Sequence, residues 1–252
     1  MDNRNAAARV ALVTGAAQGL GKGIARRLRA EGYRLVLVDI DGKAMEAGRA
    51  DAGPDALALR ADVADADSVA EVFRQVRAQC GRLDVLVNCA GILGLVDHRP
   101  PLVEDTPLEL WQRVIGVNLT GPFLMCRAAV PLLRASGGGR IVNIASRAAR
   151  TRSGDPAYAA SKGGLLAFSR YLAGEVAKHG ITVNSVAPSR VETPMTRAIG
   201  DDAVLAAKIA ETPLGRIAAV EDVAGAVAFL VSADAAFMTG AVLDVNGGSF
   251  MQ

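Results

Sequence analysis

The chain has 252 residues, of which 51% are hydrophobic and 21% charged, and its formal net charge is +2. This composition is typical of a globular protein and excludes a disordered chain. So small a net charge gives no reason to expect nucleic acid as a partner. The length fits one large α/β domain or two small ones, and because no linker, repeat or low-complexity tract interrupts it, we expect residues 1–252 to form a single domain.

Cysteine and histidine usage argues against a disulfide-stabilised protein and against a metalloprotein. The chain has three scattered cysteines, Cys80, Cys89 and Cys126. They form neither a disulfide framework nor a CxxC pair, which favours reduced thiols in a cytosolic protein. His98 and His179 lie in no ligand-spaced cluster, so we expect no metal site. We see no signal peptide and only short uncharged runs, and therefore expect a cytoplasmic protein without a membrane partner.

Short β-branched runs alternate with longer helical patterns along the chain. In chain order, the expected strands are residues 10–13, 35–38, 56–61, 85–87, 141–144, 182–186 and 242–245. The expected helices are residues 21–31, 68–80, 108–133 and 157–178. Pro122 and Pro131 should bend or divide the third helix. Near-continuous apolar strands separated by helices predict a doubly wound, Rossmann-type three-layer αβα sandwich with about seven parallel strands.

Residues 189–216 form a long stretch before the last strand. The stretch contains Pro194 and Pro213 and has no strand pattern of its own. Long insertions in compact domains are often functional. We therefore expect a substrate loop or lid that borders the site.

A glycine-rich turn lies between the first strand and the first helix. Its glycines, Gly15, Gly19 and Gly21, would allow a tight turn and a close approach of the backbone to a pyrophosphate at the helix N-terminus. Asp39 ends the second strand about twenty residues further on, where a carboxylate can bind ribose hydroxyls and would repel a 2′-phosphate. No Lys or Arg occurs at residues 16–18. The sequence predicts a dinucleotide site that favours NAD over NADP, although Asp39 could instead cap a helix.

Tyr158 and Lys162 lie four residues apart in an expected helix and therefore share one of its faces. A free tyrosine, with a pKa of about 10, is a poor base near neutral pH. A nearby ammonium favours the phenolate and lowers that pKa. With the nucleotide turn, the pair predicts hydride and proton transfer, which is the chemistry of an oxidoreductase.

Several motifs follow one another in a fixed order. They are Thr14-Gly15-x-x-x-Gly19-x-Gly21, Asn88-Cys89-Ala90-Gly91, Asn118, Ser146, Tyr158-x-x-x-Lys162, and the segments 188–195 and 239–248. This ordered set resembles the short-chain dehydrogenases/reductases over essentially the whole chain. The resemblance implies a compact NAD(P)-dependent enzyme that acts on a small-molecule alcohol or carbonyl compound.

The resemblance also implies a role for each polar residue of the catalytic set. Tyr158 would be the general acid/base, and Lys162 would lower its pKa and bind the nicotinamide ribose. Ser146 would donate a hydrogen bond to the substrate oxygen. Asn118 would anchor a water that links Lys162 to solvent. The plainer readings are a packed tyrosine, a surface lysine, a capping serine and a locally bonded asparagine.

The cofactor contacts implied by the resemblance come from several segments of the chain. Asp62 and Val63 would line the adenine, and the loop after the fourth strand would pass beneath the ribose and nicotinamide. Val191 would offer backbone groups to the carboxamide. The full expected set is Gly15, Gln18, Gly19, Leu20, Asp39, Ile40, Asp62, Val63, Asn88, Ala90, Gly91, Tyr158, Lys162, Pro188, Val191 and Thr193.

Three departures from the family pattern point to where specificity is determined. Cys89 stands where an asparagine is frequent, and Ser189 replaces the glycine that usually follows Pro188. The segment from Ser146 to Tyr158 is one residue shorter than the commonest spacing. Four arginines fall near these segments, Arg147, Arg150, Arg152 and Arg190. One of them could bind an anionic substrate group, or all could be solvated loop residues.

Three functions remain open from the sequence. The first is NAD-dependent oxidation of a secondary alcohol, such as a polyol or hydroxy acid. The second is reduction of a 3-oxoacyl thioester, and the third is a non-catalytic nucleotide sensor. We also expect a homodimer or homotetramer, with the tail 249–252 at a subunit contact. That expectation rests on apolar residues that exceed what one sheet face needs, namely Leu165, Leu166, Phe168, Leu172 and Val176.

Overall fold

A single parallel sheet organises the molecule. The structure is a computed structural model that describes residues 8–197 and 202–251, apart from the side chains of residues 47–51. Its strands are β1 (Val10–Thr14), β2 (Arg34–Asp39), β3 (Leu57–Arg60), β4 (Val85–Asn88), β5 (Gly139–Ile144), β6 (Ile181–Pro188) and β7 (Val242–Val245). They form a seven-stranded sheet in the order β3-β2-β1-β4-β5-β6-β7, with every pair parallel.

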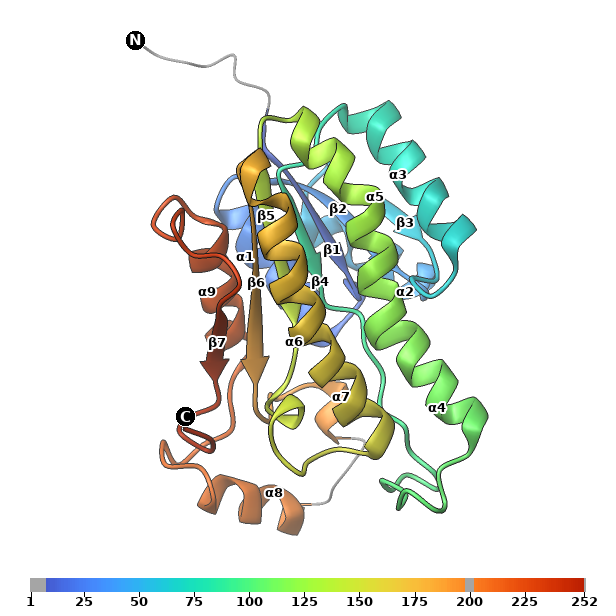
Figure 1. Cartoon of the computed structure of the whole chain (residues 1–252), viewed down its shortest axis with the longest axis vertical. Coiled ribbons are helices and arrows are strands. Elements are labelled where there is room, and N and C mark those ends of the chain that lie inside the picture. The colour runs from blue at the N-terminus through green and yellow to red at the C-terminus, as the bar shows by residue number, and fades with distance from the viewer. Residues whose placement is uncertain (1–7, 198–201, 252) are drawn as a thin grey trace.

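Helices cover both faces of this sheet (Figure 1). The helices are α1 (Gly19–Ala30), α2 (Gly42–Ala52), α3 (Ala66–Cys80), α4 (Leu108–Ile115), α5 (Gly121–Ala135), α6 (Pro156–Val176), α7 (Pro194–Arg197), α8 (Asp202–Ala210) and α9 (Val220–Val231). One face is covered by α3, α5 and α6, and the other by α1, α2 and α9. The predicted three-layer αβα sandwich is thus confirmed.

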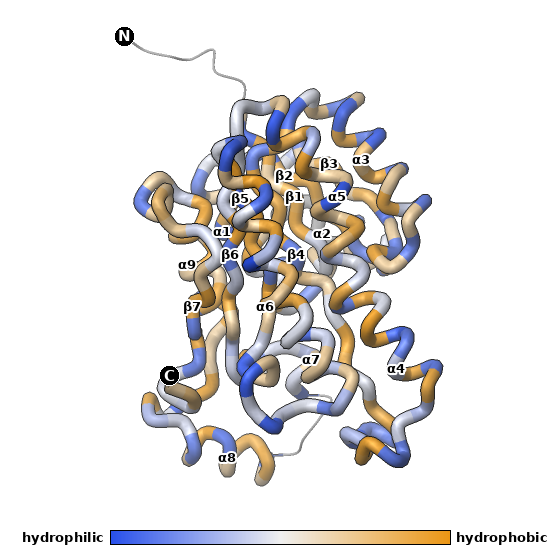
Figure 2. The backbone as a smooth tube through the Cα atoms, viewed as in Figure 1, coloured by the Kyte–Doolittle hydropathy of each residue, from blue (hydrophilic) through white to orange (hydrophobic). Residues whose placement is uncertain are grey.

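The strands are apolar on both faces because each face is a core. In β1, Val10 and Leu12 pack with the cluster under α3, α5 and α6, whereas Ala11 and Val13 pack with the cluster under α1 and α9. All four side chains are almost completely buried. Figure 2 shows the same distribution, with the central strands mostly apolar and the outer helices mixed. Double burial explains why the strands read as continuous apolar runs rather than as alternating ones.

The helix expected over residues 108–133 is divided, as predicted. A π-helical turn, η1 (Gly116–Thr120), separates α4 from α5. Pro122 follows directly, near the start of α5, and it has no N–H to donate to the carbonyl of Asn118 four residues earlier. Pro131 lies inside α5 without ending it. The carbonyl of Asn118 therefore lacks the usual N–H partner four residues on.

Among the described residues, one stretch meets the length and composition of a membrane-spanning helix. It is Leu108–Ala135, and 44% of its most apolar window is buried inside the structure. The stretch packs on α3 and α6, as a core helix does.

Four helices, α2, α7, α8 and α9, have no counterpart among the expected elements. The most apolar of them, α9, buries Val223 and Val227 against α1. The expected lid, residues 189–216, contains α7 and α8, which lie near the carboxyl ends of β6 and β7 (Figure 1). Residues 198–201 of that segment are outside the described residues.

Candidate active site

A cavity of about 1230 Å³ opens at the carboxyl ends of the strands. Of the expected cofactor contacts, all but Asn88 line it. Asn88 is buried, and its side-chain amide donates to Asn143 Oδ1 at 2.8 Å and to Cys126 Sγ at 3.4 Å. Its side chain therefore joins β4 to β5 and α5 inside the core instead of facing the cavity, and a cofactor contact of Asn88 stays a prediction.

Glycines shape the part of the cavity next to β1 and α1. Gly15 has a positive φ of 68°, and a Cβ there would lie 2.9 Å from the backbone nitrogen of Ala90. At Gly21, a Cβ would lie only 2.0 Å from the carbonyl oxygen of Gly15. Thr14 Oγ1 closes this turn by accepting from the N–H groups of Cys89 and Ala90 at 3.0 and 3.1 Å. Side chains at either glycine would therefore disrupt the turn.

The N-terminus of α1 fits an anionic group. Its N-cap residue, Gln18, makes no side-chain capping hydrogen bond, and the first turn carries no acidic residue. The free N–H groups of a helix start, together with the helix dipole, favour a phosphate. Because Gln18, Gly19 and Leu20 line the cavity at this point, the turn and helix start fit a dinucleotide pyrophosphate.

The acidic residues at the ends of β2 and β3 are fixed by backbone N–H groups. Asp39 accepts from Ala17 at 2.9 Å and from Asp41 at 3.0 Å. The N-cap of α2 is Asp41, so the alternative that Asp39 caps a helix is wrong. Asp62 accepts from the N–H of Ala64 at 2.9 Å. Asp39 and Asp62 both line the cavity and give this end a negative charge.

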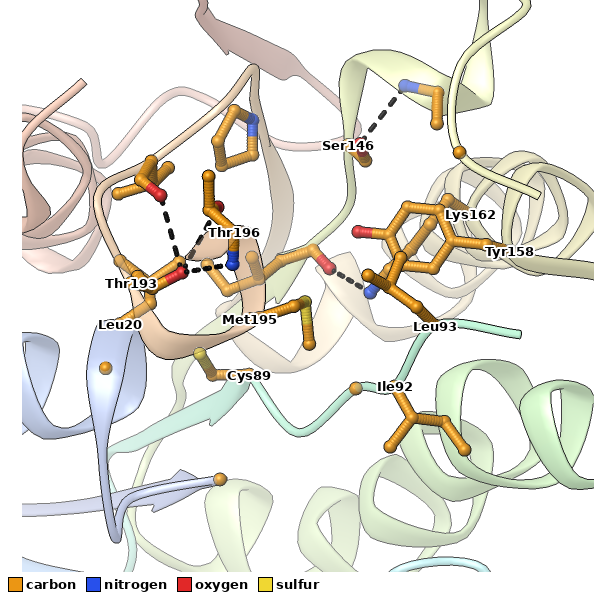
Figure 3. A pocket seen from close by; sticks show the side chains of 18 of the residues that line it. Leu20, Cys89, Ile92, Leu93, Ser146, Tyr158, Lys162, Thr193, Met195 and Thr196 are labelled. Carbon is orange, nitrogen blue, oxygen red and sulfur yellow. Dashed lines mark hydrogen bonds between the residues drawn. The ribbon is translucent and has the colours of Figure 1, made fainter. Parts of the chain in front are cut away.

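The first turns of α6 place Tyr158 and Lys162 at the opposite end of the cavity. Lys162 is 4% exposed, and its Nζ donates to the carbonyl of Ile144 at 2.8 Å and lies 5.6 Å from the centre of the Tyr158 ring. Figure 3 shows the Tyr158 hydroxyl directed into the open space that faces Ser146. Ser146 Oγ accepts from the N–H of Ala148 at 3.1 Å, which leaves its own proton available to donate. The geometry brings a phenol, a hydroxyl and an amine together.

Burial controls the protonation of this group. It raises the pKa of Tyr158 above its usual value, with smaller increases from the nearby Asp155 and Cys89, while a hydrogen bond from Ser146 lowers it. Burial likewise lowers the pKa of Lys162 to about 8. In the chain by itself the desolvation cost therefore dominates the pKa of Tyr158, and the expected lowering by Lys162 stays a prediction. A protonated phenol at neutral pH suits Tyr158 as a proton donor.

The low pKa of Lys162 predicts a pH-dependent stability. Between about pH 8 and 10.5 the unfolded chain holds a proton on Lys162 that the folded chain has released, so this residue makes the free energy of unfolding rise with pH. Relative to Lys162→Met, the wild type should gain about 2 kcal/mol between pH 7.5 and 10. Urea unfolding of both proteins at the two pH values measures the difference. Parallel pH profiles would contradict a strongly lowered pKa.

Asn118 acts through its neighbours rather than through the cavity. It is fully buried, and its amide exchanges two hydrogen bonds with the backbone of Ile92, at 2.8 and 2.9 Å, and donates to Ser161 Oγ at 3.2 Å. A Cβ at Gly91 would lie 3.3 Å from Asn118 Oδ1 and 3.5 Å from Lys162 Nζ. The side chain thus joins the loop after β4 to α6. The expected water link from Asn118 to Lys162 stays a prediction.

One structurally important residue, Asp155, is absent from the expected set. It is 3% exposed and caps α6, accepting from the N–H of Tyr158 at 2.8 Å and from the N–H of Gly94 at 2.8 Å. Pro156 begins the helix, so the Asp-Pro pair was a start signal in the sequence. The hydrogen bond from Gly94 joins two segments that are far apart in sequence, so no local sequence pattern could have predicted it.

Removing this cap should cost stability. Asp155→Ala leaves two backbone N–H groups without their acceptor, and we expect a loss of about 2–4 kcal/mol in the free energy of unfolding, measured with urea. Asp155→Asn keeps one acceptor and removes the charge that raises the Tyr158 pKa. It should lose less stability and lower the kinetic pKa of turnover. Equal stability of Asp155→Ala and the wild type would show that the cap is not structural.

The four arginines separate into two groups. Arg147, Arg152 and Arg190 line the cavity, whereas Arg150 does not. Arg150 forms an ion pair with Asp244 and stacks on Phe250, with 5.1 Å from its guanidinium carbon to the ring centre. It is therefore removed from the candidates for substrate binding. Two cations that the sequence did not single out, Arg113 and Lys208, also line the cavity.

The two substitutions relative to the family pattern also face the cavity. Cys89 and Ser189 are both lining residues. Burial raises the pKa of the Cys89 thiol to about 12, so it is a neutral thiol at physiological pH. Neither residue removes a group of the catalytic set.

Known proteins resemble this chain over nearly its whole length. Residues 15–249 match the family model described as Enoyl-(Acyl carrier protein) reductase. The 3-oxoacyl-[acyl-carrier-protein] reductase FabG of Escherichia coli (strain K12) is 40% identical over 244 residues, covering 96% of this chain and 98% of the relative. The cis-4-hydroxycyclohexanecarboxylate dehydrogenase of Sinomonas cyclohexanicum is 42% identical over 245 residues, covering 96% of each.

A solved structure agrees with these relatives. The 3-ketoacyl-(acyl-carrier-protein) reductase from Brucella melitensis, complexed with NADH, superposes with a TM-score of 0.89 at 34% identity and covers 96% of this chain and 98% of that one. Identities of this size over almost complete chains show the family. The chain belongs to the short-chain dehydrogenase/reductase family and is an NAD(P)-dependent oxidoreductase that acts on CH–OH or keto groups.

Proposed function

We propose that the chain reduces the keto group of a 3-oxoacyl thioester. The sequence placed alcohol oxidation first and this reaction second, and the relatives reverse that order. Those named 3-oxoacyl-[acyl-carrier-protein] reductase are joined by an acetoacetyl-CoA reductase from Allochromatium vinosum, 39% identical over 250 residues. The observation that carries the proposal is the Tyr158 hydroxyl, directed into the cavity beside Ser146, and burial, which raises its pKa, suits it to donate a proton.

The proposed chemistry uses three side chains. When bound, NAD(P)H supplies the hydride to the carbonyl carbon. Tyr158 donates its proton to the carbonyl oxygen as charge develops there, and Ser146 donates a hydrogen bond to the same oxygen. The buried Lys162, hydrogen-bonded to Ile144, adds a positive charge close to the phenolate that forms. The reverse reaction oxidises the corresponding alcohol with the same groups.

A second candidate is the oxidation of a hydroxy acid that carries its own carboxylate. The cavity-lining arginines favour it, and the relative from Sinomonas cyclohexanicum is named for such a compound. The non-catalytic sensor is the weakest candidate, because the chain keeps both Tyr158 and Lys162. A sensor would bind NADH without turnover.

The preference for NAD is also a proposal. Asp39 places a carboxylate at the cavity edge, and a 2′-phosphate there would be repelled. Arg60, on the neighbouring strand, donates its Nε to the carbonyl of Ile40 at 3.2 Å and is not a lining residue. The backbone N–H groups of Ala17 and Asp41 hold the Asp39 carboxylate in this position, which supports the proposed preference for NAD.

Turnover separates the three candidates. Purified protein is mixed with NADH and acetoacetyl-CoA, or with NAD⁺ and cis-4-hydroxycyclohexanecarboxylate, and the NADH absorbance is followed. Thioester reduction predicts consumption of NADH in the first mixture. NADH formation in the second mixture alone favours the hydroxy acid, and tight NADH binding with no turnover across a broader alcohol and ketone panel favours the sensor.

We further propose a homodimer or homotetramer, but from other residues than those that the sequence suggested. Leu165, Leu166, Leu172 and Val176 are buried within one chain, so they are not surplus apolar surface. Exposed aromatic side chains on α4, α5 and α6 carry the proposal instead, namely Trp111, Phe123 and Tyr171. The cytoplasmic location and the single-domain organisation stay predictions, and residue 252 of the expected tail contact is outside the described residues.

Charges on this aromatic surface should weaken assembly. The double substitution Phe123→Glu and Tyr171→Glu places two carboxylates where Phe123 is 43% and Tyr171 is 72% exposed. We expect a smaller species by light scattering, because buried unpaired charge disfavours an interface. Val103→Glu, at a 79% exposed loop position, is the control and should leave the mass unchanged. An unchanged mass of the double variant would place any interface elsewhere.

A further inference from the structure

The charges along the cavity are segregated by sign. Asp39 and Asp62 lie at the end formed by β2 and β3. Near Ser146, on the other side, Lys162 of the catalytic set is joined by the lining cations Arg147, Arg152, Arg190 and Lys208, with Glu211 as the acidic residue among them. A further lining cation, Arg113, lies on α4 and is exposed. A net positive cavity end attracts anions. The question is which of these cations is free to bind one.

Arg147 and Arg190 have no carboxylate partner among residues 8–197 and 202–251. The Arg147 guanidinium donates to the backbone carbonyl of Ser249 at 3.3 Å, and no hydrogen bond of the Arg190 guanidinium is found in the same set. Other arginines of this region are paired, as Arg150–Asp244, Arg197–Glu192 and Arg216–Asp222 show. Arg152 also has no carboxylate partner in this set, but its side chain is exposed to water. Arg147 and Arg190 are half-buried, so water satisfies them only in part.

The charge of Arg147 acts on the Arg190 guanidinium. The pKa of Arg190 is lowered, mainly by burial and then by the charge of Arg147. Glu211 is near both, but its carboxylate is already held by Lys208 Nζ at 2.7 and 2.8 Å. Two half-buried like charges raise the energy of the empty cavity, and an anion placed between them would lower it.

The backbone attaches this pair to two segments that line the cavity. Arg147 directly follows Ser146, and Arg190 follows Pro188 and Ser189 at the carboxyl end of β6. Two segments that both line the cavity therefore present one guanidinium each. An oxyanion is the ligand that two planar guanidinium forks bind best, through paired charge-assisted hydrogen bonds.

We propose that Arg147 and Arg190 form a binding site for an oxyanion of the substrate, either the carboxylate of an oxo or hydroxy acid or a phosphate of a pantetheine-type thioester. The inference rests on the proposed function in that the oxyanion belongs to the molecule whose keto or hydroxyl group reacts. Arg147 and Arg190 would then determine which substrates this cavity accepts. It also excludes Arg150 from that role.

Binding to the NADH-saturated protein tests the site directly. Titration calorimetry compares cyclohexanecarboxylate with cyclohexanecarboxamide, and inorganic phosphate is titrated separately. The wild type should bind at least one of the two anions, cyclohexanecarboxylate or phosphate. If the substrate oxyanion is a carboxylate, cyclohexanecarboxylate should bind about tenfold more tightly than its amide. The double variant Arg147→Met, Arg190→Met should lose that binding. Arg74→Met, which removes the same charge from the exposed surface of α3, should retain it.

Turnover then distinguishes the two sources. Two pairs of substrates are compared. The first is 4-oxocyclohexanecarboxylate and its amide. The second is acetoacetyl-CoA and the phosphate-free acetoacetyl N-acetylcysteamine thioester. The ratio of kcat/KM within one pair should fall about tenfold in the double variant. A fall in the first pair identifies a carboxylate, and a fall in the second identifies a phosphate.

Failure of the site and failure of the reaction differ in their readouts. No anion binding, or equal binding by wild type and the double variant, overturns the anion site whatever the turnover. Anion binding that depends on Arg147 and Arg190, with no turnover of any ketone or alcohol by the wild type, overturns the proposed reaction and leaves the anion site.

Discussion

Tyr158→Phe should lower kcat/KM for keto reduction about a thousandfold, because it removes the proton donor and little else. The phenyl ring keeps the packing of the buried side chain, and Lys162 keeps its hydrogen bond to Ile144. NADH affinity should therefore change far less than turnover. Steady-state kinetics and NADH fluorescence titration on the same preparation measure the two quantities.

A second tyrosine supplies the matched control. Tyr33 is also buried, and its hydroxyl donates to the carbonyl of Val231 at 3.4 Å, between α1 and the end of α9. Tyr33→Phe removes the same atom outside the cavity and should leave kcat/KM within about twofold of wild type. Near-wild-type turnover by Tyr158→Phe would contradict the assignment of the proton donor.

Asp39→Asn should shift cofactor preference by about a hundredfold, measured as the ratio of kcat/KM for NADH to that for NADPH. The amide keeps the size of the side chain and one acceptor for the N–H groups of Ala17 and Asp41. It removes a negative charge, and repulsion between that charge and a 2′-phosphate at short range is worth about 3 kcal/mol. The gain should come mostly from faster use of NADPH.

Asp41→Asn is the control for this charge change. Asp41 lies two residues further on, caps α2 and is not a lining residue of the cavity. Its substitution should leave the cofactor ratio unchanged. If Asp39→Asn also leaves the ratio unchanged, Asp39 does not determine the choice between the two cofactors.

Strand positions were the part of the fold most accessible from the sequence. The run expected at residues 35–38 is β2 (Arg34–Asp39), because a doubly buried strand is apolar throughout. The run at residues 242–245 is β7, a half-buried edge strand that was recognised from its valines and leucine. Helix α9 was missed although it is strongly apolar. A helix apolar around most of its circumference lacks the one-sided periodicity that identifies a surface helix.

Site residues that share a helix or a turn were predictable, and those joined by tertiary contacts were not. Tyr158 and Lys162 follow from i, i+4 spacing, and the glycines from the turn that they allow. The raised pKa of Tyr158 was not predictable, since it depends on burial by segments distant in sequence. The same limit applies to Arg150 and Arg190, which look alike in the sequence until the ion pair with Asp244 separates them.

The transfer of an isotopic label tests the central claim most directly. Two forms of NADH are used, each carrying deuterium on one of the two faces of nicotinamide carbon 4. The protein is incubated with each form and a panel of 3-oxoacyl thioesters and oxo acids. The products are analysed by mass spectrometry. An NAD(P)-dependent oxidoreductase acting on keto groups predicts an alcohol with one deuterium on its carbinol carbon from one of the two labelled cofactors. Product alcohol without deuterium from either cofactor, or no product from any compound of the panel, would contradict the account.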